Sequence, residues 1–229
     1  MKILLASPFY EVKAYSPYVS SLMKTVALLQ KLGIEYDYWE LSGDSYIDRA
    51  RNTIANTFRE SDYTHLLFID SDMSWDLEGF GRLLMADADV VGAGYPCKNN
   101  WDHFSCILNC NDDGTPIVNE QGLLSAWGVP TGFMKIRREV FDRLAEADPD
   151  NFYYEGGDDG KEPTKRYNFF GRIPPLGEDI SFCRRWVEKA GGTLWVEPRI
   201  TMGHYGVKKW EGNYHEFLTR CPGGSESTE

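Results

Sequence analysis

The chain has 229 residues and carries 24 basic against 35 acidic side chains, a formal charge of −11 at neutral pH. This length indicates one domain with a sizeable core, and the acidic balance argues against a partner that is nucleic acid. Five cysteines without a Cys-x-x-Cys pair predict neither a disulfide framework nor a zinc site. We find no signal peptide and no transmembrane segment in the sequence, and therefore expect a cytoplasmic protein.

Strand and helix signals alternate through residues 1–95 in the order β-α-β-α-β-α-β. The first helix is predicted to be capped by Ser16, to begin with Pro17 and to end at Gly33. Its core-facing stripe is predicted to contain Val19, Leu22, Met23, Val26 and Leu29. Strands are predicted over 3–6, 34–41, 65–69 and 90–95, and further helices over 46–59 and 76–85. This order predicts an α/β fold with a mostly parallel sheet and helices on both faces.

The pattern changes after residue 95. A smaller antiparallel hairpin is predicted over 104–118, with its turn at Asn111-Asp112-Asp113-Gly114. Residues 148–177 are rich in Asp, Gly, Pro and Tyr and show no periodicity, which predicts one long functional loop. The remaining predicted elements are a strand over 132–136, a helix over 138–145, a helix from Glu178 and a strand over 193–196. We expect one domain over 1–221 and a flexible tail over 222–229.

Asp70-Ser71-Asp72 is the strongest chemical signal, because it directly follows the apolar strand 66–69. Ligands bind at the carboxyl ends of strands in open α/β sheets, and two such carboxylates can face one Mn²⁺ or Mg²⁺ ion. The plain alternative is a turn in which Asp72 caps the next helix. The run from His65 to Asp72 resembles the DxD element of GT-A glycosyltransferases. That resemblance implies that Asp72 is the more direct metal ligand and that Asp70 touches the donor ribose or the metal shell.

Arg51 lies on the apolar face of the 46–59 helix, together with Ile47, Ile54 and Phe58. A buried arginine must be paired or reach an anion, so Arg51 either forms an ion pair with Asp44 or Asp48 or contacts a nucleotide. The run from Gly43 to Asn52 resembles the Arg-x-Arg-Asn helix of GT-A enzymes of bacterial, phage and viral type. The resemblance implies a donor-side Arg51, an Asp44 that accepts from a uracil or guanine ring, and a base packed by Ser7, Phe9 and Tyr10.

Glu178-Asp179 opens a helix after a long loop, where acidic residues also suit the helix dipole. The element is similar to the Glu-Asp motif of GT-A enzymes, which implies Asp179 as the general base and Glu178 as its neighbour or an acceptor contact. His204 is either structural or, in the resemblance, a third metal ligand after Asp70 and Asp72. Lys208 and Lys209 are either a solvated surface pair or, in the resemblance, cations that meet the diphosphate.

Gly132 is either part of a core strand or the point where a donor sugar approaches the backbone. The resemblance implies a GT-A (Rossmann-like) fold with a nucleotide-binding half over 1–95 and an acceptor and metal half over 96–221. The expected function is Mn²⁺- or Mg²⁺-dependent transfer of a sugar from a UDP- or GDP-linked donor to a glycan, protein or lipid acceptor. Asp179 as base indicates inversion, whereas the histidine and lysines are similar to retaining members.

Two alternatives stay open. A sugar nucleotidyltransferase has the same fold, but it carries a glycine-rich basic loop where this chain has Ser7-Pro8-Phe9-Tyr10. A non-catalytic carbohydrate-binding relative is less consistent with keeping Asp70, Asp72, Glu178, Asp179 and His204 together. If the source is a phage or a virus, the expected location is the cytoplasm of its host.

Overall fold

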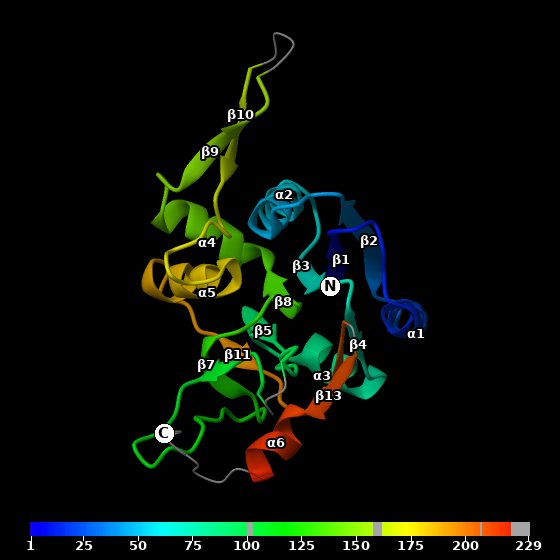
Figure 1. The fold of residues 1–229 in the computed structure, drawn as a ribbon. Coiled ribbons are helices and arrows are strands. Elements are labelled where there is room, and N and C mark those ends of the chain that lie inside the picture. The colour runs from blue at the N-terminus through cyan, green and yellow to red at the C-terminus, as the bar shows by residue number, and fades with distance from the viewer. Residues whose placement is uncertain (100–102, 158–161, 207, 221–229) are drawn as a thin grey trace.

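The computed structural model describes residues 1–99, 103–157, 162–206 and 208–220. Within them, eight strands form one central sheet in the order β2-β1-β3-β8-β5-β11-β7-β6 (Figure 1). Strands β7 and β8 run antiparallel to the other six, so the sheet is mostly parallel as predicted. The strands are β1 (Lys2–Phe9), β2 (Glu35–Ser42), β3 (His65–Ile69), β5 (Val90–Gly92), β6 (Ile107–Leu108), β7 (Leu124–Gly128), β8 (Phe133–Arg137) and β11 (Trp195–Val196). The predicted tail lies outside the described residues.

Helices cover both faces of the sheet, because its buried strands are apolar on both sides. In β3, Leu66 and Phe68 pack into one cluster while Leu67 and Ile69 pack into the other. The first cluster is covered by α2 (Ile47–Arg59), α4 (Arg138–Ala147) and α5 (Glu178–Glu188). The second is covered by α1 (Ser16–Leu32) and α3 (Leu77–Met85). No described helix is both long and apolar enough to cross a bilayer.

Helix α1 buries only part of the predicted stripe: Leu29 is buried and Leu22 packs against the core, but the buried face is rotated away from Val19 and Met23. Its N-cap is Tyr15 rather than Ser16, and its buried side chains are Tyr18, Ser21, Thr25 and Leu29. The reason is the facing indole of Trp75, which donates to Thr25 Oγ1 at 2.8 Å while Ser21 Oγ donates to the Trp75 carbonyl at 3.0 Å. Buried hydroxyls with partners replace part of the apolar stripe, and Val19 and Met23 face solvent.

A second, three-stranded sheet joins the end of the chain to the segment after β3. Its order is β13-β12-β4, with β4 (Met73–Trp75), β12 (Thr201–Tyr205) and β13 (Lys209–Asn213). The β12–β4 register pairs His204 with Met73, and the Tyr205 amide donates to the Asp72 carbonyl at 2.8 Å. This pairing holds β12 beside the Asp70–Asp72 turn. The last helix, α6 (Tyr214–Arg220), follows β13.

Two predictions for the second half of the chain are wrong in part. The loop expected over 148–177 contains an antiparallel hairpin of β9 (Phe152–Glu155) and β10 (Thr164–Tyr167), which extends away from the sheet in Figure 1. The hairpin expected over 104–118 keeps its tight turn, with Gly114 at φ 82°, but β6 pairs with β7 instead. Strands β9 and β10 are neighbours in the chain, but neither contains a buried residue and both lack an apolar alternation, whereas β6 pairs with a strand that lies beyond the predicted hairpin.

Two asparagines of α2 hold the chain that leaves β10. Asn56 accepts from the Tyr167 amide and donates to the Tyr167 carbonyl, both at 2.9 Å. One turn earlier, Asn52 accepts from the Phe170 amide at 2.8 Å and donates to Asn168 Oδ1 at 2.9 Å. Both side chains are buried. They replace the missing sheet partners of segment 167–170, which leads toward α5.

Candidate functional site

The predicted acidic residues meet at the carboxyl end of β3. Here a cleft of about 260 Å³ runs along the Asp70–Asp72 turn, and an adjoining hollow of about 650 Å³ shares Tyr10, Ser71 and Asp72 with it. These volumes suit a small organic ligand. The cleft is lined by Pro8, Tyr10, Asp44, Ser45, Tyr46, Ile47, Asp70, Ser71, Asp72 and Arg172.

Arg51 connects the Asp70–Asp72 turn to the Glu178–Asp179 motif. Its side chain is only 4% exposed, and its Nη2 donates to both carboxylate oxygens of Asp70 at 3.0 and 3.1 Å. Its Nε lies 3.6 Å from Oε1 of Glu178 at the start of α5. The predicted burial of Arg51 is therefore correct, but its partners are Asp70 and Glu178 rather than Asp44 or Asp48. Among the described residues, Arg51 Nη1 has no hydrogen-bond partner.

Asp72, His204 and a lysine that the sequence did not indicate form a second group. His204 Nε2 lies 3.7 Å from Asp72 Oδ2, and the Lys98 ammonium donates to the same carboxylate oxygen. Two ligands about 2.1 Å from one cation lie at most about 4.2 Å apart, so Asp72 and His204 can reach the same ion. In the described residues no three acidic, cysteine or histidine side chains form a complete metal cage. The pair instead fits a hard cation that takes its other ligands from substrate and water.

The ring of His204 is oriented toward Asp72 by its other nitrogen. Nδ1 lies 2.8 Å from the Pro96 carbonyl, which can only accept, so Nδ1 carries the proton. Burial lowers the pKa of His204, and the neutral ring then presents the Nε2 lone pair toward Asp72. A histidine held in this way by a carbonyl is the usual arrangement of a metal ligand. Tyr95 packs edge-on against the ring at 5.1 Å.

The site carries more negative than positive charge. Four carboxylates, from Asp70, Asp72, Glu178 and Asp179, surround two cations, from Arg51 and Lys98. Counting four against two leaves two formal negative charges, the charge that one divalent ion would balance. Burial raises the pKa of Asp70; Arg51 opposes this shift and Asp72 adds to it. Burial and the charge of Glu178 likewise raise the pKa of Asp179.

Gly132 makes a close contact, but with a side chain of the protein. A Cβ at this position would lie 2.5 Å from the Tyr95 hydroxyl, so the space above Gly132 belongs to the Tyr95 ring. The Gly132 carbonyl accepts from the Asp70 amide at 3.0 Å and so fixes the start of the acidic turn. Burial raises the pKa of Tyr95 well above its ordinary value, and Asp70 adds to the shift. Tyr95 is therefore a neutral wall of the site.

Three residues predicted to bind the nucleotide have partners within the protein. Ser7 is fully buried and shares a 2.5 Å hydrogen bond with the Tyr18 hydroxyl, so its side chain does not face the cleft. Phe9 is 5% exposed and packs edge-on against Tyr18 at 5.9 Å, at a smaller hollow next to β2. Asp44 does line the cleft, where it accepts from Arg49 at 2.8 Å.

Neither C-terminal lysine is among the described residues that line the cleft or the adjoining hollow. Lys208 lies over the Trp210 ring at 5.0 Å, and Lys209 pairs with Glu211 on β13. Lys98 is the lysine that pairs with Asp72. No local pattern distinguishes Lys98 in the sequence, because β5 ends at Gly92 and the intervening residues are held by tertiary contacts. The neighbouring Trp210 indole, which donates to the Asn99 carbonyl at 2.6 Å, is one of these contacts.

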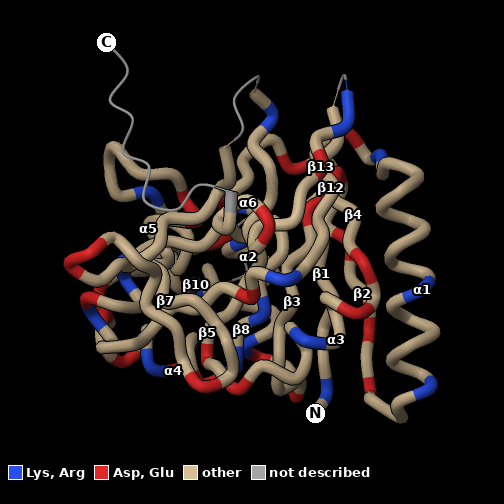
Figure 2. Tube along the Cα trace, turned by 90° about the horizontal axis from the view of Figure 1, so that it is seen from below, with Lys and Arg blue, Asp and Glu red and all other residues tan. Residues whose placement is uncertain are grey.

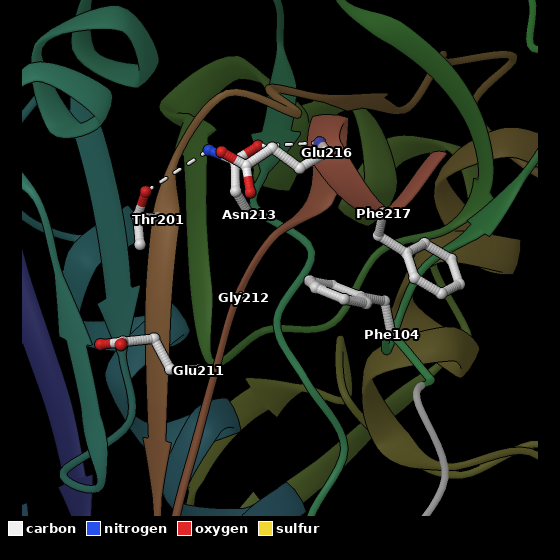
Figure 3. A pocket seen from close by; sticks show the side chains of 7 residues that line it. All are labelled: Phe104, Thr201, Glu211, Gly212, Asn213, Glu216 and Phe217. Carbon is white, nitrogen blue, oxygen red and sulfur yellow. Dashed lines mark hydrogen bonds between the residues drawn. The ribbon is translucent and has the colours of Figure 1, made fainter. Parts of the chain in front are cut away.

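A separate hollow of about 280 Å³ lies beside β12, β13 and α6 (Figure 3). Its polar groups bond to one another: Asn213 reaches Thr201 Oγ1 at 3.4 Å and accepts from the Glu216 amide at 3.2 Å. One wall is Phe104, which stacks on Tyr214 at 5.0 Å. None of the predicted site residues lines it, so it is not part of the candidate site.

No protein-family model and no curated protein matches this sequence. Solved structures are similar in fold. A crystal structure of GalNAc-T7 with UDP, GalNAc and Mn²⁺ aligns with a TM-score of 0.52 and 11% identity, over 89% of this chain and 44% of that chain. This chain thus spans less than half the length of that protein.

Two further structures align more weakly. The Drosophila beta-1,4-galactosyltransferase 7 mutant with manganese, UDP-Gal and xylobiose gives a TM-score of 0.45 and 14% identity, over 100% of this chain and 77% of that chain. A glycosyltransferase involved in the glycosylation of the major capsid of PBCV-1 gives a TM-score of 0.43 and 11% identity, over 86% of this chain and 81% of that chain. At such identities a likeness shows the fold alone. With its sheet order, two helical layers and small antiparallel sheet, the chain has the GT-A glycosyltransferase fold.

Proposed function

We propose that this protein is a metal-dependent glycosyltransferase that moves a sugar from a nucleoside-diphosphate sugar to an acceptor hydroxyl. The observation that carries the proposal is that Asp72, which lines the cleft, lies next to the Nε2 atom of His204 and the Lys98 ammonium. The similar GalNAc-T7 structure contains UDP and Mn²⁺, which supports a nucleotide and a cation in a site of this fold.

Asp72 and His204 would hold Mn²⁺ or Mg²⁺, which when bound stabilises negative charge on the departing diphosphate. Both oxygens of Asp70 accept from Arg51, and Asp70 also lines the cleft. It orients Arg51 and adds charge next to the cation. The excess of two negative charges in the site supports a divalent rather than a monovalent ion.

Lys98 is the residue of this chain that suits the leaving diphosphate. Its ammonium pairs with Asp72 at the edge of the cleft, while Lys208 and Lys209 pair elsewhere. A lysine ammonium is mobile on its four-carbon stem, so Lys98 can turn from Asp72 to a phosphate oxygen when a cation occupies the carboxylate. There it would neutralise charge that grows as the sugar–oxygen bond breaks.

Asp179 is the proposed base. Its side chain is partly buried at the start of α5, and its raised pKa makes it a stronger base than an ordinary aspartate. Glu178 is held by Arg51 and keeps the first turn of α5 against the site. The proton of the acceptor hydroxyl would pass to the Asp179 carboxylate as the oxygen attacks the sugar.

Calorimetric titration of UDP and GDP, with Mn²⁺ or with EDTA, tests the proposal. We expect one nucleotide to bind only with Mn²⁺, and Asp72→Ala to weaken this binding by at least about 10–100-fold. Asp87→Ala is the matched control, since Asp87 and Asp89 repeat the same motif at the opposite sheet edge, where they pair with Arg137. Lys98→Ala should weaken the binding of UDP more than the binding of UMP, and Lys209→Ala should change the binding of neither nucleotide.

Three results would contradict the proposal. Failure of both nucleotides to bind would favour a non-catalytic carbohydrate-binding relative. Binding that is the same with Mn²⁺ and with EDTA would remove the cation from the site. Release of pyrophosphate from a nucleoside triphosphate and a sugar phosphate would identify a sugar nucleotidyltransferase.

A further inference from the structure

One segment of this acidic protein is free of acidic residues. Residues 12–34 contain three lysines and no Asp or Glu, although the whole chain has a formal charge of −11. They form the loop after β1 and the whole of α1, and Figure 2 shows α1 at the outer edge of the molecule with only basic residues coloured on it. The lysines are Lys13, Lys24 and Lys31. The segment is therefore a basic strip on an acidic molecule.

The same segment exposes large apolar side chains. Val19 and Met23 of α1 are 47% and 65% exposed, and one helical turn separates them, so they lie on one side of the helix. Val12 and Tyr15 in the preceding loop are 70% and 41% exposed. We call the set Val12, Lys13, Tyr15, Val19, Met23 and Lys24 the amphiphilic face.

Val12 supports a role for this face because its backbone is strained. Its φ of +54° is the only positive value among the described non-glycine residues, and a β-branched side chain is least suited to that region. Its side chain is exposed, so core packing does not offset the strain. Strained residues are retained where the displayed group has a use.

We propose that the amphiphilic face docks this protein on an anionic lipid bilayer. Its separate apolar side chains can enter the headgroup region, and its lysines are attracted to anionic lipids, each contributing roughly fivefold in affinity. Docking through this face presents the segment that lacks acidic residues to the anionic surface. Glu11 lies 3.2 Å from Lys13, but both are exposed and such a pair is weak.

A second copy of this chain fits the face less well. In a two-fold symmetric contact the same patch meets itself, so Lys13 and Lys24 of both molecules would gather at one interface that offers no acidic partner from this patch. The exposed apolar side chains are separated by polar ones, which suits a fluid headgroup layer better than a packed protein interface.

Docking would also place the cleft at the lipid surface. Lys13 and Tyr15 line the hollow that contains Asp72, so the amphiphilic face and the candidate site share one rim. The Tyr15 ring lies 6.0 Å from the Tyr205 ring of β12. If the proposed transfer reaction is correct, its acceptor is a hydroxyl on a lipid or on a lipid-linked glycan. This last step rests on the proposed function, whereas the docking does not.

Co-sedimentation of the full chain with vesicles tests the docking. We expect binding to phosphatidylcholine vesicles that contain phosphatidylglycerol, little binding to phosphatidylcholine alone, and weaker binding as salt is added. Lys13→Gln with Lys24→Gln should reduce binding roughly 30-fold. Met23→Asp should reduce it more than about tenfold. Met85→Asp, at a 75% exposed methionine of α3, is the matched control and should bind like wild type.

Two results would overturn the docking: no binding of the wild-type chain to the anionic vesicles, or equal losses for Met23→Asp and Met85→Asp. A concentration-dependent dimer that Met23→Asp abolishes would identify a second copy as the occupant, and would also overturn it. Titration of UDP with Mn²⁺ into Met23→Asp separates the two proposals, because this variant should lose vesicle binding and keep the nucleotide binding of the wild type. If the wild-type chain binds vesicles but no nucleotide, the docking is supported and the proposed reaction is contradicted. If it binds a nucleotide but no vesicles, only the docking is contradicted.

Discussion

At the scale of single residues, Arg51 explains how four carboxylates can share one site. Burial disfavours its charge, but Asp70 and Glu178 outweigh this cost and raise the pKa of Arg51. The guanidinium therefore stays charged, and it links a residue that follows β3 to a residue that begins α5. Removal of Arg51 would leave buried carboxylates unpaired, so its loss would affect folding as well as binding.

Asp179 gives a prediction at the same scale. A base must be ionised, and burial with the neighbouring Glu178 raises the pKa of Asp179 above 3.8. We therefore expect kcat/KM to fall as the pH drops through a value above that of an ordinary aspartate. Asp179→Asn should lower kcat by about 10²–10⁴-fold, while the exposed Asp150→Asn should not. A pH–rate profile of Asp179→Asn that matched wild type would assign the base to another residue.

At the scale of elements, Asn52 and Asn56 of α2 form hydrogen bonds with the backbone of segment 167–170, as a neighbouring strand would. Asn56→Leu would leave the Tyr167 amide and carbonyl without partners, and each lost partner costs about 1–3 kcal/mol of the free energy of unfolding. Asn56→Asp keeps the acceptor but turns a buried carboxylate toward the Tyr167 and Asn52 carbonyl oxygens, so near neutral pH it should cost at least as much. Urea unfolding measures both, with Thr57→Leu at an exposed position of the same helix as control. Equal stabilities for Asn56→Leu and Thr57→Leu would show that segment 167–170 is held by other contacts.

Elements were predictable where their signals are local. The strand over 65–69 and the helix start at Glu178 agree with β3 and α5, because an apolar run and an acidic first turn specify them. The buried face of α1 was not predictable, because the Trp75 indole, distant in the sequence, makes Thr25 a core residue. Lys98 was not predictable either, since only the folded chain brings it to Asp72.

At the scale of the whole molecule, buried Lys135 links stability to pH. It is 1% exposed and donates to the carbonyls of Leu84 and Ala86 at 2.9 and 2.8 Å. Burial, with a smaller effect from Arg137, lowers the pKa of Lys135 from 10.5 to about 7. Between these values the unfolded chain binds more protons than the folded one, so the free energy of unfolding should rise with pH. The slope is at most about 1.4 kcal/mol per pH unit.

Chemical denaturation from pH 7 to pH 9 measures this slope. Lys135→Met should remove its contribution, whereas Lys189→Met, at an exposed lysine, should keep the wild-type slope. An unchanged slope in Lys135→Met would mean that this ammonium stays protonated in the folded protein. The experiment compares slopes rather than absolute stabilities. Lys135→Met removes the donor to the Leu84 and Ala86 carbonyls and therefore lowers stability whatever the protonation of Lys135.

The pairing of β12 with β4 has a consequence for the order of folding. Ser74 and Tyr205 contact each other across 131 residues of chain, so the strand that carries His204 joins the molecule through one of its most distant contacts. Contacts this distant in sequence form late, because the loop between them must close first. On the ribosome, β1, β2, β3 and the Asp70–Asp72 turn are synthesised well before His204, whereas β11 of the large sheet comes only shortly before it. A nascent chain would therefore carry the Asp70–Asp72 turn before its histidine, and the contact between Asp72 and His204 would form late in folding.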